Sequence, residues 1–185
     1  MGIWRTKARH PSKLAKCVQD QEGQYFSLEL PTMMRMLKMT QGVVPRNGAC
    51  GFSALYGSAS RMVKPPALFG RADCQNIGDG HKYFHRVIMH VVAKEPLPKD
   101  LWMTSGVTCL AASLWQKPVY VLEAHPRCHD VWRLSRFDVH GKETVFADKN
   151  CIVQEAEAMQ VGHVLVLENN HYTHLVLRFT FHILR

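Results

Sequence analysis

The stretch Pro45-Arg46-Asn47-Gly48-Ala49-Cys50-Gly51-Phe52-Ser53-Ala54-Leu55 decides how the rest of this chain is interpreted. A loop of proline, asparagine and glycine leads directly into a cysteine. Apolar residues then return every three or four positions, which predicts a helix with one buried stripe, formed by Phe52, Leu55, Tyr56, Ala59, Met62 and Val63. Cys50 is therefore expected at a helix N-terminus, where the helix dipole and free backbone N–H groups favour a thiolate. The simpler alternative is a helix start followed by a buried, inert cysteine.

A second motif, Asn170-His171-Tyr172, favours the reactive interpretation of Cys50. The runs 163–168 and 172–179 are rich in β-branched and aromatic residues and predict two strands, with a turn at Asn169 and Asn170. His171 is then expected at the mouth of a hairpin. A cysteine at a helix start that faces a histidine on a strand is the general arrangement of cysteine peptidases. There the imidazole takes the thiol proton, and backbone N–H groups hold the oxyanion.

These residues resemble a known family. The sequence Asn-Gly-Ala-Cys-Gly-Phe-Ser-Ala-Leu at 47–55 is similar to the Asp-Gly-Asn-Cys-Leu-Phe-Arg-Ala-Leu signature of the ovarian tumour (OTU) cysteine proteases. His171-Tyr172 resembles the terminal His-Tyr of that family. Trp102, a helix at 105–115 and a strand at 118–123 also follow the family's order, so the resemblance covers about residues 40–180. Cys-Gly followed by an aromatic residue is most similar to the OTU-like proteases of positive-strand RNA viruses.

The resemblance implies a hydrolase, a thiol protease that acts as a deubiquitinase in ubiquitin-like conjugation pathways. Such an enzyme cleaves after the C-terminal glycine of ubiquitin or a ubiquitin-like modifier, and a viral one can also process a polyprotein. Cys50 would be the nucleophile and His171 the base, and the loop Asn47, Gly48, Ala49 and Cys50 would hold the oxyanion. No cofactor or metal is implied.

The third catalytic residue departs from the family pattern. The family's acid before the cysteine is Asn47 here, and its Asp or Asn two residues after the histidine is Thr173. A third member is needed to orient the imidazole and fix its tautomer. Asn169, from the same strand face, or the Thr173 hydroxyl can serve, or an acid from elsewhere, Asp138 or Asp148. A dyad without an acid is the remaining alternative.

Composition predicts one compact domain with a separate basic arm. The chain has 185 residues, 46% of them hydrophobic, and a formal charge of +8. Residues 1–16 carry five basic residues and no acid, which leaves 18 basic and 15 acidic residues, or +3, in a domain at 17–185. The arm is either a solvated tail or a contact for polyanions through charge alone.

Several global properties follow from the same composition. We find no apolar run of about 18 residues, so no membrane span is expected. The start lacks the apolar core of a signal peptide, and the six cysteines follow no repeated short spacing. These cysteines need not form structural disulfides, and a reducing compartment is expected: the cytoplasm, or the host cytoplasm for a viral protein. The chain is expected to be a monomer.

The remaining pattern predicts an α+β fold, with helices packed on a mixed or antiparallel central sheet. Helices are expected at 33–37, 50–63, 81–94 and 105–115, and strands at 119–123, 131–137, 144–147, 164–167 and 175–179. The helix that begins at Cys50 is expected to end before Pro65 and Pro66, because proline cannot lie in a helix interior.

Other titratable residues are weaker candidates. His125, Cys128 and His129 lie close in sequence but lack a matching pair at zinc-site spacing, and His81 and His85 lie one helical turn apart without a carboxylate. Cys109 is expected to be buried and inert, and Cys74 and Cys151 are expected in loops. His163 begins a strand and is a weak rival base, whereas His174 should point to the face opposite His171.

A function of another class also fits the sequence. A non-catalytic module with the OTU-like fold can bind ubiquitin, RNA or a protein partner. The missing acids at Asn47 and Thr173 favour the module, and the Cys50–His171 pair favours the enzyme.

Overall fold

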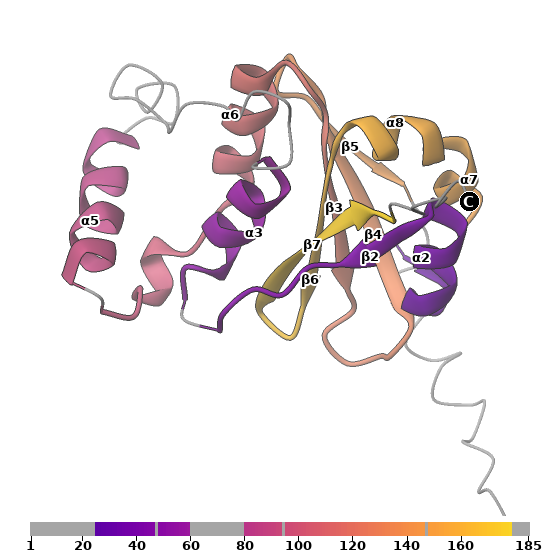
Figure 1. Cartoon of the computed structure of the whole chain (residues 1–185), viewed down its shortest axis with the longest axis horizontal. Helices are drawn as coiled ribbons and strands as arrows, with labels where there is room; N and C mark the ends of the chain where they lie inside the picture. Colours follow the sequence, from indigo (N-terminus) through magenta and orange to yellow (C-terminus); the bar gives the residue numbers. More distant parts are fainter. Residues whose placement is uncertain (1–24, 47, 60–79, 94, 147, 179–185) are drawn as a thin grey trace, which may run out of the picture.

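A computed structural model describes residues 25–46, 48–59, 80–93, 95–146 and 148–178 of the chain. Its helices, named as in Figure 1, are α2 (Leu30–Leu37), α3 (Cys50–Ala59), α5 (Gly80–Ala93), the 3-10 helix η2 (Lys99–Leu101), α6 (Ser105–Trp115), α7 (Cys151–Gln154) and α8 (Ala156–Val161). Its strands are β1 (Phe26–Ser27), β2 (Met39–Gln41), β3 (Val119–Ala124), β4 (Val131–Phe137), β5 (Glu143–Phe146), β6 (His163–Glu168) and β7 (His171–Leu177). The basic arm at 1–16, and with it the predicted boundary near Cys17, lies outside the described residues.

The strands form one mixed sheet in the order β1-β4-β3-β6-β7-β2, with β5 paired to β4. β3 and β6 run parallel, and the other pairs are antiparallel. Figure 1 shows α3, α5 and α6 on one side of this sheet and α2, α7 and α8 on the other. The predicted α+β fold, with helices packed on a mixed sheet, is confirmed.

Each face of the sheet has its own hydrophobic core, because side chains alternate along a strand. On β3, Val119 and Val121 face the core shared with α3 and α6. Tyr120 and Leu122 face the other core, shared with α2, α7 and α8. A sheet that is buried on both faces explains why its central strands read as nearly continuous apolar runs.

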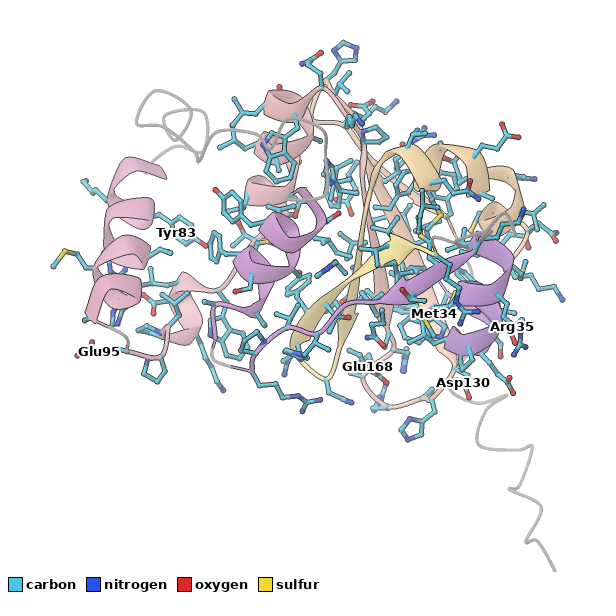
Figure 2. All side chains as sticks on the ribbon, in the orientation of Figure 1. Met34, Arg35, Tyr83, Glu95, Asp130 and Glu168 are labelled. Atoms are coloured by element: carbon cyan, nitrogen blue, oxygen red, sulfur yellow. The ribbon has the colours of Figure 1, made fainter. Side chains whose placement is uncertain are left out.

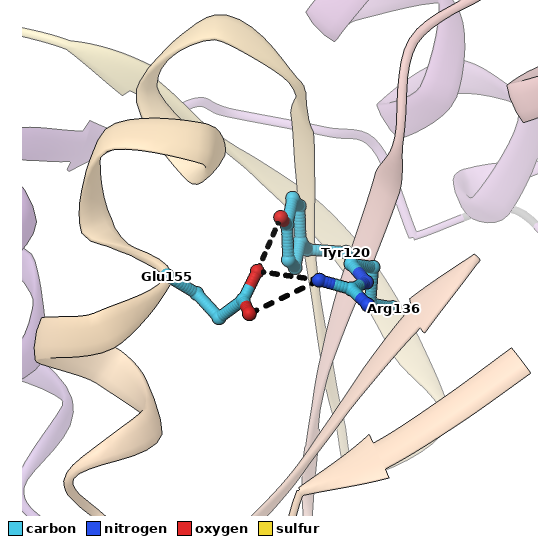
Figure 3. A network of polar contacts seen from close by, with 3 residues as sticks. All are labelled: Tyr120, Arg136 and Glu155. Carbon is cyan, nitrogen blue, oxygen red and sulfur yellow. Dashed lines mark hydrogen bonds and ion pairs between the residues drawn. The ribbon is translucent and has the colours of Figure 1, made fainter. Parts of the chain in front are cut away.

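A polar network ties the second core together (Figure 3). Glu155, between α7 and α8, accepts a hydrogen bond from the hydroxyl of Tyr120 at 2.7 Å. Both of its carboxylate oxygens lie 3.1 Å from Nη1 of Arg136 on β4. Burial and the neighbouring carboxylate raise the pKa of Tyr120, so the phenol stays neutral and donates. The network fixes the two short helices on the sheet.

Three elements differ from the sequence expectation. α2 begins at Leu30, not at Met33, since Pro31 fits the first turn of a helix, where its missing N–H is not needed. Residues 151–161 form α7 and α8 in place of a loop, and Cys151 is buried at the start of α7. Burial raises the pKa of Cys151 to about 12, so this thiol is neutral. Short helices of this kind carry too little periodicity to be recognised in sequence.

No helix in the described part of the chain is both long enough and apolar enough to cross a membrane.

Candidate active site

Cys50 is the first residue of α3 and is only 6% exposed. Its Sγ accepts a hydrogen bond from the backbone N–H of Tyr172 at 3.3 Å. This contact joins the cysteine motif to the histidine motif, which are 122 residues apart. The helix N-terminus leaves backbone N–H groups near the sulfur without helical partners, as an oxyanion site needs.

The hairpin that carries His171 has a two-residue turn. Asn169 and Asn170 have φ of 50° and 58° and lie between Glu168 and His171, which pair across the ladder. Two consecutive left-handed residues define the type I′ turn, whose twist matches that of the flanking strands. The predicted turn is confirmed.

This turn also corrects the expected position of Asn169. The residue is exposed at the hairpin tip, so the alternation of a strand does not apply to it. It lines a small cavity with the loop His125–Asp130, and it does not line the cavity that contains His171. The structure thus gives Asn169 a role in the turn, and shows it on no strand face shared with the imidazole.

His171 lines a cavity of about 350 Å³ between the hairpin and the segment that follows β2. The cavity is lined by Gln41, Gly42, Val43, Val44, Arg46, Glu168, His171 and Thr173. Val43, at its rim, is 98% exposed. Figure 2 labels Glu168, which lies at the end of β6 beside the turn. A cavity lined by a base, a cation, a carboxylate and two valines suits an extended peptide segment.

Three causes set the protonation of His171. Burial and the positive charge of Arg46 lower the pKa of the imidazole, and a hydrogen bond with the Val44 backbone raises it, with a net lowering. A bond that raises the pKa of a histidine is one in which a ring N–H donates to a carbonyl. His171 is therefore neutral at neutral pH, which is the state a general base requires.

The described hydrogen bonds of Cys50 do not include one to the imidazole. Within the described residues, no hydrogen bond joins Cys50 Sγ to the ring of His171; the sulfur meets the backbone of Tyr172 instead. Thr173 shares the cavity with His171, and its hydroxyl accepts a hydrogen bond from Nε2 of Gln41 at 2.7 Å. Thr173 is thus engaged with the edge strand.

The approach loop, which we define as residues 42–49, reaches Cys50 along a tight path. Gly48 has φ of +74°, and a Cβ there would lie 2.7 Å from the carbonyl oxygen of Leu97. Only glycine fits both constraints. The indole N–H of Trp102 donates to the same carbonyl at 3.1 Å, and the hydroxyl of Tyr83 bonds the carbonyls of Leu101 and Trp102. Tyr83 extends from α5 toward α3 in Figure 2. Asn47 of the predicted oxyanion loop lies outside the described residues.

The rival acids lie far from His171 in the fold. Asp138 follows β4 and accepts the backbone N–H groups of His140 and Lys142. The last residue of β4 pairs with the first residue of β3, which in turn pairs with His163 at the start of β6. The hairpin turn follows the other end of β6. Asp148 bonds the backbone and the side chain of Asn150 at the start of α7. The structure brings neither acid to the site, which removes both alternatives.

The rival histidines are also accounted for. His163 is buried, its Nδ1 lies 3.0 Å from the hydroxyl of Ser58, and burial with nearby Lys117 lowers its pKa to about 4. It lies at the end of β6 away from Cys50, so it is not a base for this thiol. His174 is buried against α3, whereas His171 and Thr173 line the cavity. The predicted opposition of His171 and His174 is confirmed.

The other cysteines differ in state. Cys50, Cys109 and Cys151 are free thiols, and Cys109 is half-buried, not fully buried as expected, with its Sγ 3.4 Å from the carbonyl oxygen of Gly141. Burial raises the pKa of Cys109. Cys128 is disulfide-bonded, although nothing in the sequence indicated a structural disulfide. Cys74 and the pair His81 and His85 lie outside what the structure describes of side chains.

Across the described residues, no group of three or more His, Cys, Asp or Glu side chains is arranged to hold a metal ion. The sequence patterns did not identify Val44, Arg46 or Glu168 as neighbours of His171. Arg46 stands in the quoted loop, but only the pairing of β2 with β7 brings that loop to the hairpin.

Comparison with known proteins gives one result on the fold. No protein-family model and no curated protein sequence matches the chain. Among solved structures, the chain is similar to an OTU deubiquitinase from Wolbachia pipientis wMel, whose crystal structure was determined bound to ubiquitin. The two are 14% identical, the match covers 76% of this chain and 97% of the other, and the TM-score is 0.48. A similarity with this TM-score and this identity carries no argument about function.

Proposed function

We propose that the chain is a thiol-dependent peptidase of the OTU type. It would hydrolyse the bond after the C-terminal glycine of ubiquitin or a ubiquitin-like modifier, as the sequence motifs imply. The observation that carries the proposal is the contact of Cys50 Sγ with the Tyr172 backbone, because it joins the two motifs at a helix N-terminus.

The chemistry assigns each group a step. The Cys50 sulfur attacks the carbonyl carbon of the C-terminal glycine, while His171 takes the thiol proton. Backbone N–H groups of the loop at Gly48, Ala49 and Cys50, with Asn47, stabilise the oxyanion. The C–N bond then breaks, and the imidazolium gives its proton to the leaving amine. Water hydrolyses the thioester and releases the modifier and the thiol.

The proposed base requires a small rearrangement. The backbone of His171 adjoins the N–H that bonds Cys50 Sγ, whereas its ring lies near Val44 and Arg46. Catalytic hydrogen bonds are often long in unliganded enzymes and form with substrate. We propose that substrate in the cavity turns the imidazole toward the sulfur, and that the Val44 carbonyl orients the ring in place of an acid. Asn169 and Thr173 then act only through the turn and the edge strand.

The test uses the full chain and a fluorogenic amide of the ubiquitin C-terminus. Turnover that disappears in Cys50→Ala supports the proposal, and turnover that survives this change rejects it. The substrate class suggests the cytoplasm as the location, the host cytoplasm for a viral enzyme, since Cys50 must stay reduced.

A second function, a binding module for ubiquitin, RNA or a protein, is favoured by one observation. The described contacts do not join Cys50 Sγ to the His171 ring or a carboxylate to His171. Saturable binding of ubiquitin, measured by calorimetry, without any turnover would support the module.

A further inference from the structure

His174 occupies a position that the proposed chemistry does not use. The residue is 6% exposed on β7, and its side chain lies on the face covered by α3. It follows His171 by three positions on the same strand. A polar ring at a buried position requires an explanation beyond volume.

The ring of His174 packs closely against two glycines, Gly42 and Gly57. A Cβ on Gly42 would lie 2.3 Å from Nε2 of His174, and a Cβ on Gly57 would lie 2.6 Å from Cε1. Real Cβ atoms essentially never lie this close to another residue's atoms, so a side chain at either glycine would force the ring of His174 or the backbone to shift. Both glycines meet the same end of the ring, at Cε1 and Nε2.

These contacts connect the segments on which the proposed site depends. Gly42 begins the approach loop, and its N–H also donates to the backbone carbonyl of His174 at 2.7 Å. Gly57 lies in α3, the helix that begins with Cys50. His174 itself belongs to the strand that begins with His171. One imidazole therefore contacts both the loop and the helix from the strand of the base.

We propose that His174 is a positioning residue that sets the distance between Cys50 and His171. The inference rests on the proposed function. The ring acts as a spacer, so a smaller side chain lets α3 and the approach loop shift toward β7. A shift of about 1 Å in a reacting group can lower a rate by about 100-fold.

The kinetic test compares His174→Ala with Leu175→Ala. Leu175 is the next residue, is also buried, and faces the other core, so it controls for a cavity of similar size. We expect His174→Ala to lower kcat about 10- to 100-fold with KM within about twofold. Leu175→Ala should lower the Tm and leave kcat unchanged. Equal kcat in His174→Ala and wild type would overturn the inference; if His174→Ala fails to fold, His174→Asn takes its place.

A second test reads the spacer without catalysis. Alanine is favoured over glycine inside a helix, so Gly57→Ala should raise the Tm wherever the methyl group fits. We expect Gly57→Ala to lower the Tm of the wild type and to raise the Tm of His174→Ala. A rise in both backgrounds would show that the ring yields freely, and would reject the spacer. A wild type without turnover would reject the proposed function alone, since the Tm cycle still tests the spacer.

Discussion

Charged side chains have different surroundings in two regions of the molecule, beside α7 and α8 and at the hairpin cavity. Beside α7 and α8, Glu155 has partners for both oxygens, and Arg136 and Tyr120 supply them (Figure 3). At the hairpin, Glu168 and Arg46 line an open cavity, and neither forms an ion pair among the described residues. A satisfied network stabilises a fold, whereas charges left facing a cavity are available to a ligand. The Glu155 network is therefore a structural region, and the hairpin cavity is the candidate site.

We expect the largest effect from a change in the candidate site alone, at the proposed nucleophile. Cys50→Ala should abolish turnover of a ubiquitin C-terminal amide while the Tm changes little, since one small side chain at a helix start is removed. Cys109→Ala is the matched control: it should change stability by a packing amount and keep kcat. Residual turnover in purified Cys50→Ala would contradict the account.

The next effect concerns the base. His171→Ala should lower kcat/KM by orders of magnitude, because both deprotonation of the thiol and protonation of the amine depend on the imidazole. His140→Ala, at an exposed turn, serves as control and should match the wild type. Steady-state kinetics would decide, and a loss below about threefold, or under 1 kcal/mol of barrier, would exclude His171 as the base.

A change in the Glu155 network should lower the free energy of unfolding and leave the rate unchanged. Glu155→Gln removes the charge that pairs Arg136 and weakens the acceptor for Tyr120. We expect a loss of about 1–3 kcal/mol in the free energy of unfolding, measured by urea denaturation, with kcat unchanged. A fall in kcat with unchanged stability would show that the network and the hairpin cavity are not independent.

The smallest effect is a shift in pH dependence. Arg46 lowers the pKa of His171, so Arg46→Gln should raise it. The neutral imidazole is the active form, and the acid limb of the kcat/KM profile should therefore move to higher pH. Arg127→Gln, at an exposed position in the other cavity, should leave the limb in place. A shift to lower pH in Arg46→Gln would refute the assignment.

The sequence predicted the parts of this comparison that depend on local pattern. The spacing after Cys50 indicated α3, and Asn169-Asn170 indicated the turn, because left-handed residues and apolar periodicity leave direct signals. The surroundings of His171 left none. β2 has three residues, too few for an alternation pattern, yet its pairing with β7 brings Val44 and Arg46 to the imidazole. Asn169 was placed by strand alternation, which ends where the turn begins.

The charge network was equally invisible in sequence. Tyr120, Arg136 and Glu155 belong to three separate elements, and α7 and α8 are too short to show a helical period. Long-range pairing of this kind depends on topology, which no local window contains.

The most direct test of the central claim is a mass measurement on the intact chain after exposure to ubiquitin with a C-terminal electrophile. We expect one covalent adduct on the wild type, mapped to Cys50 by peptide sequencing and absent in Cys50→Ala. Labelling at Cys109 or Cys151, or none at a probe concentration that saturates a known deubiquitinase, would contradict it.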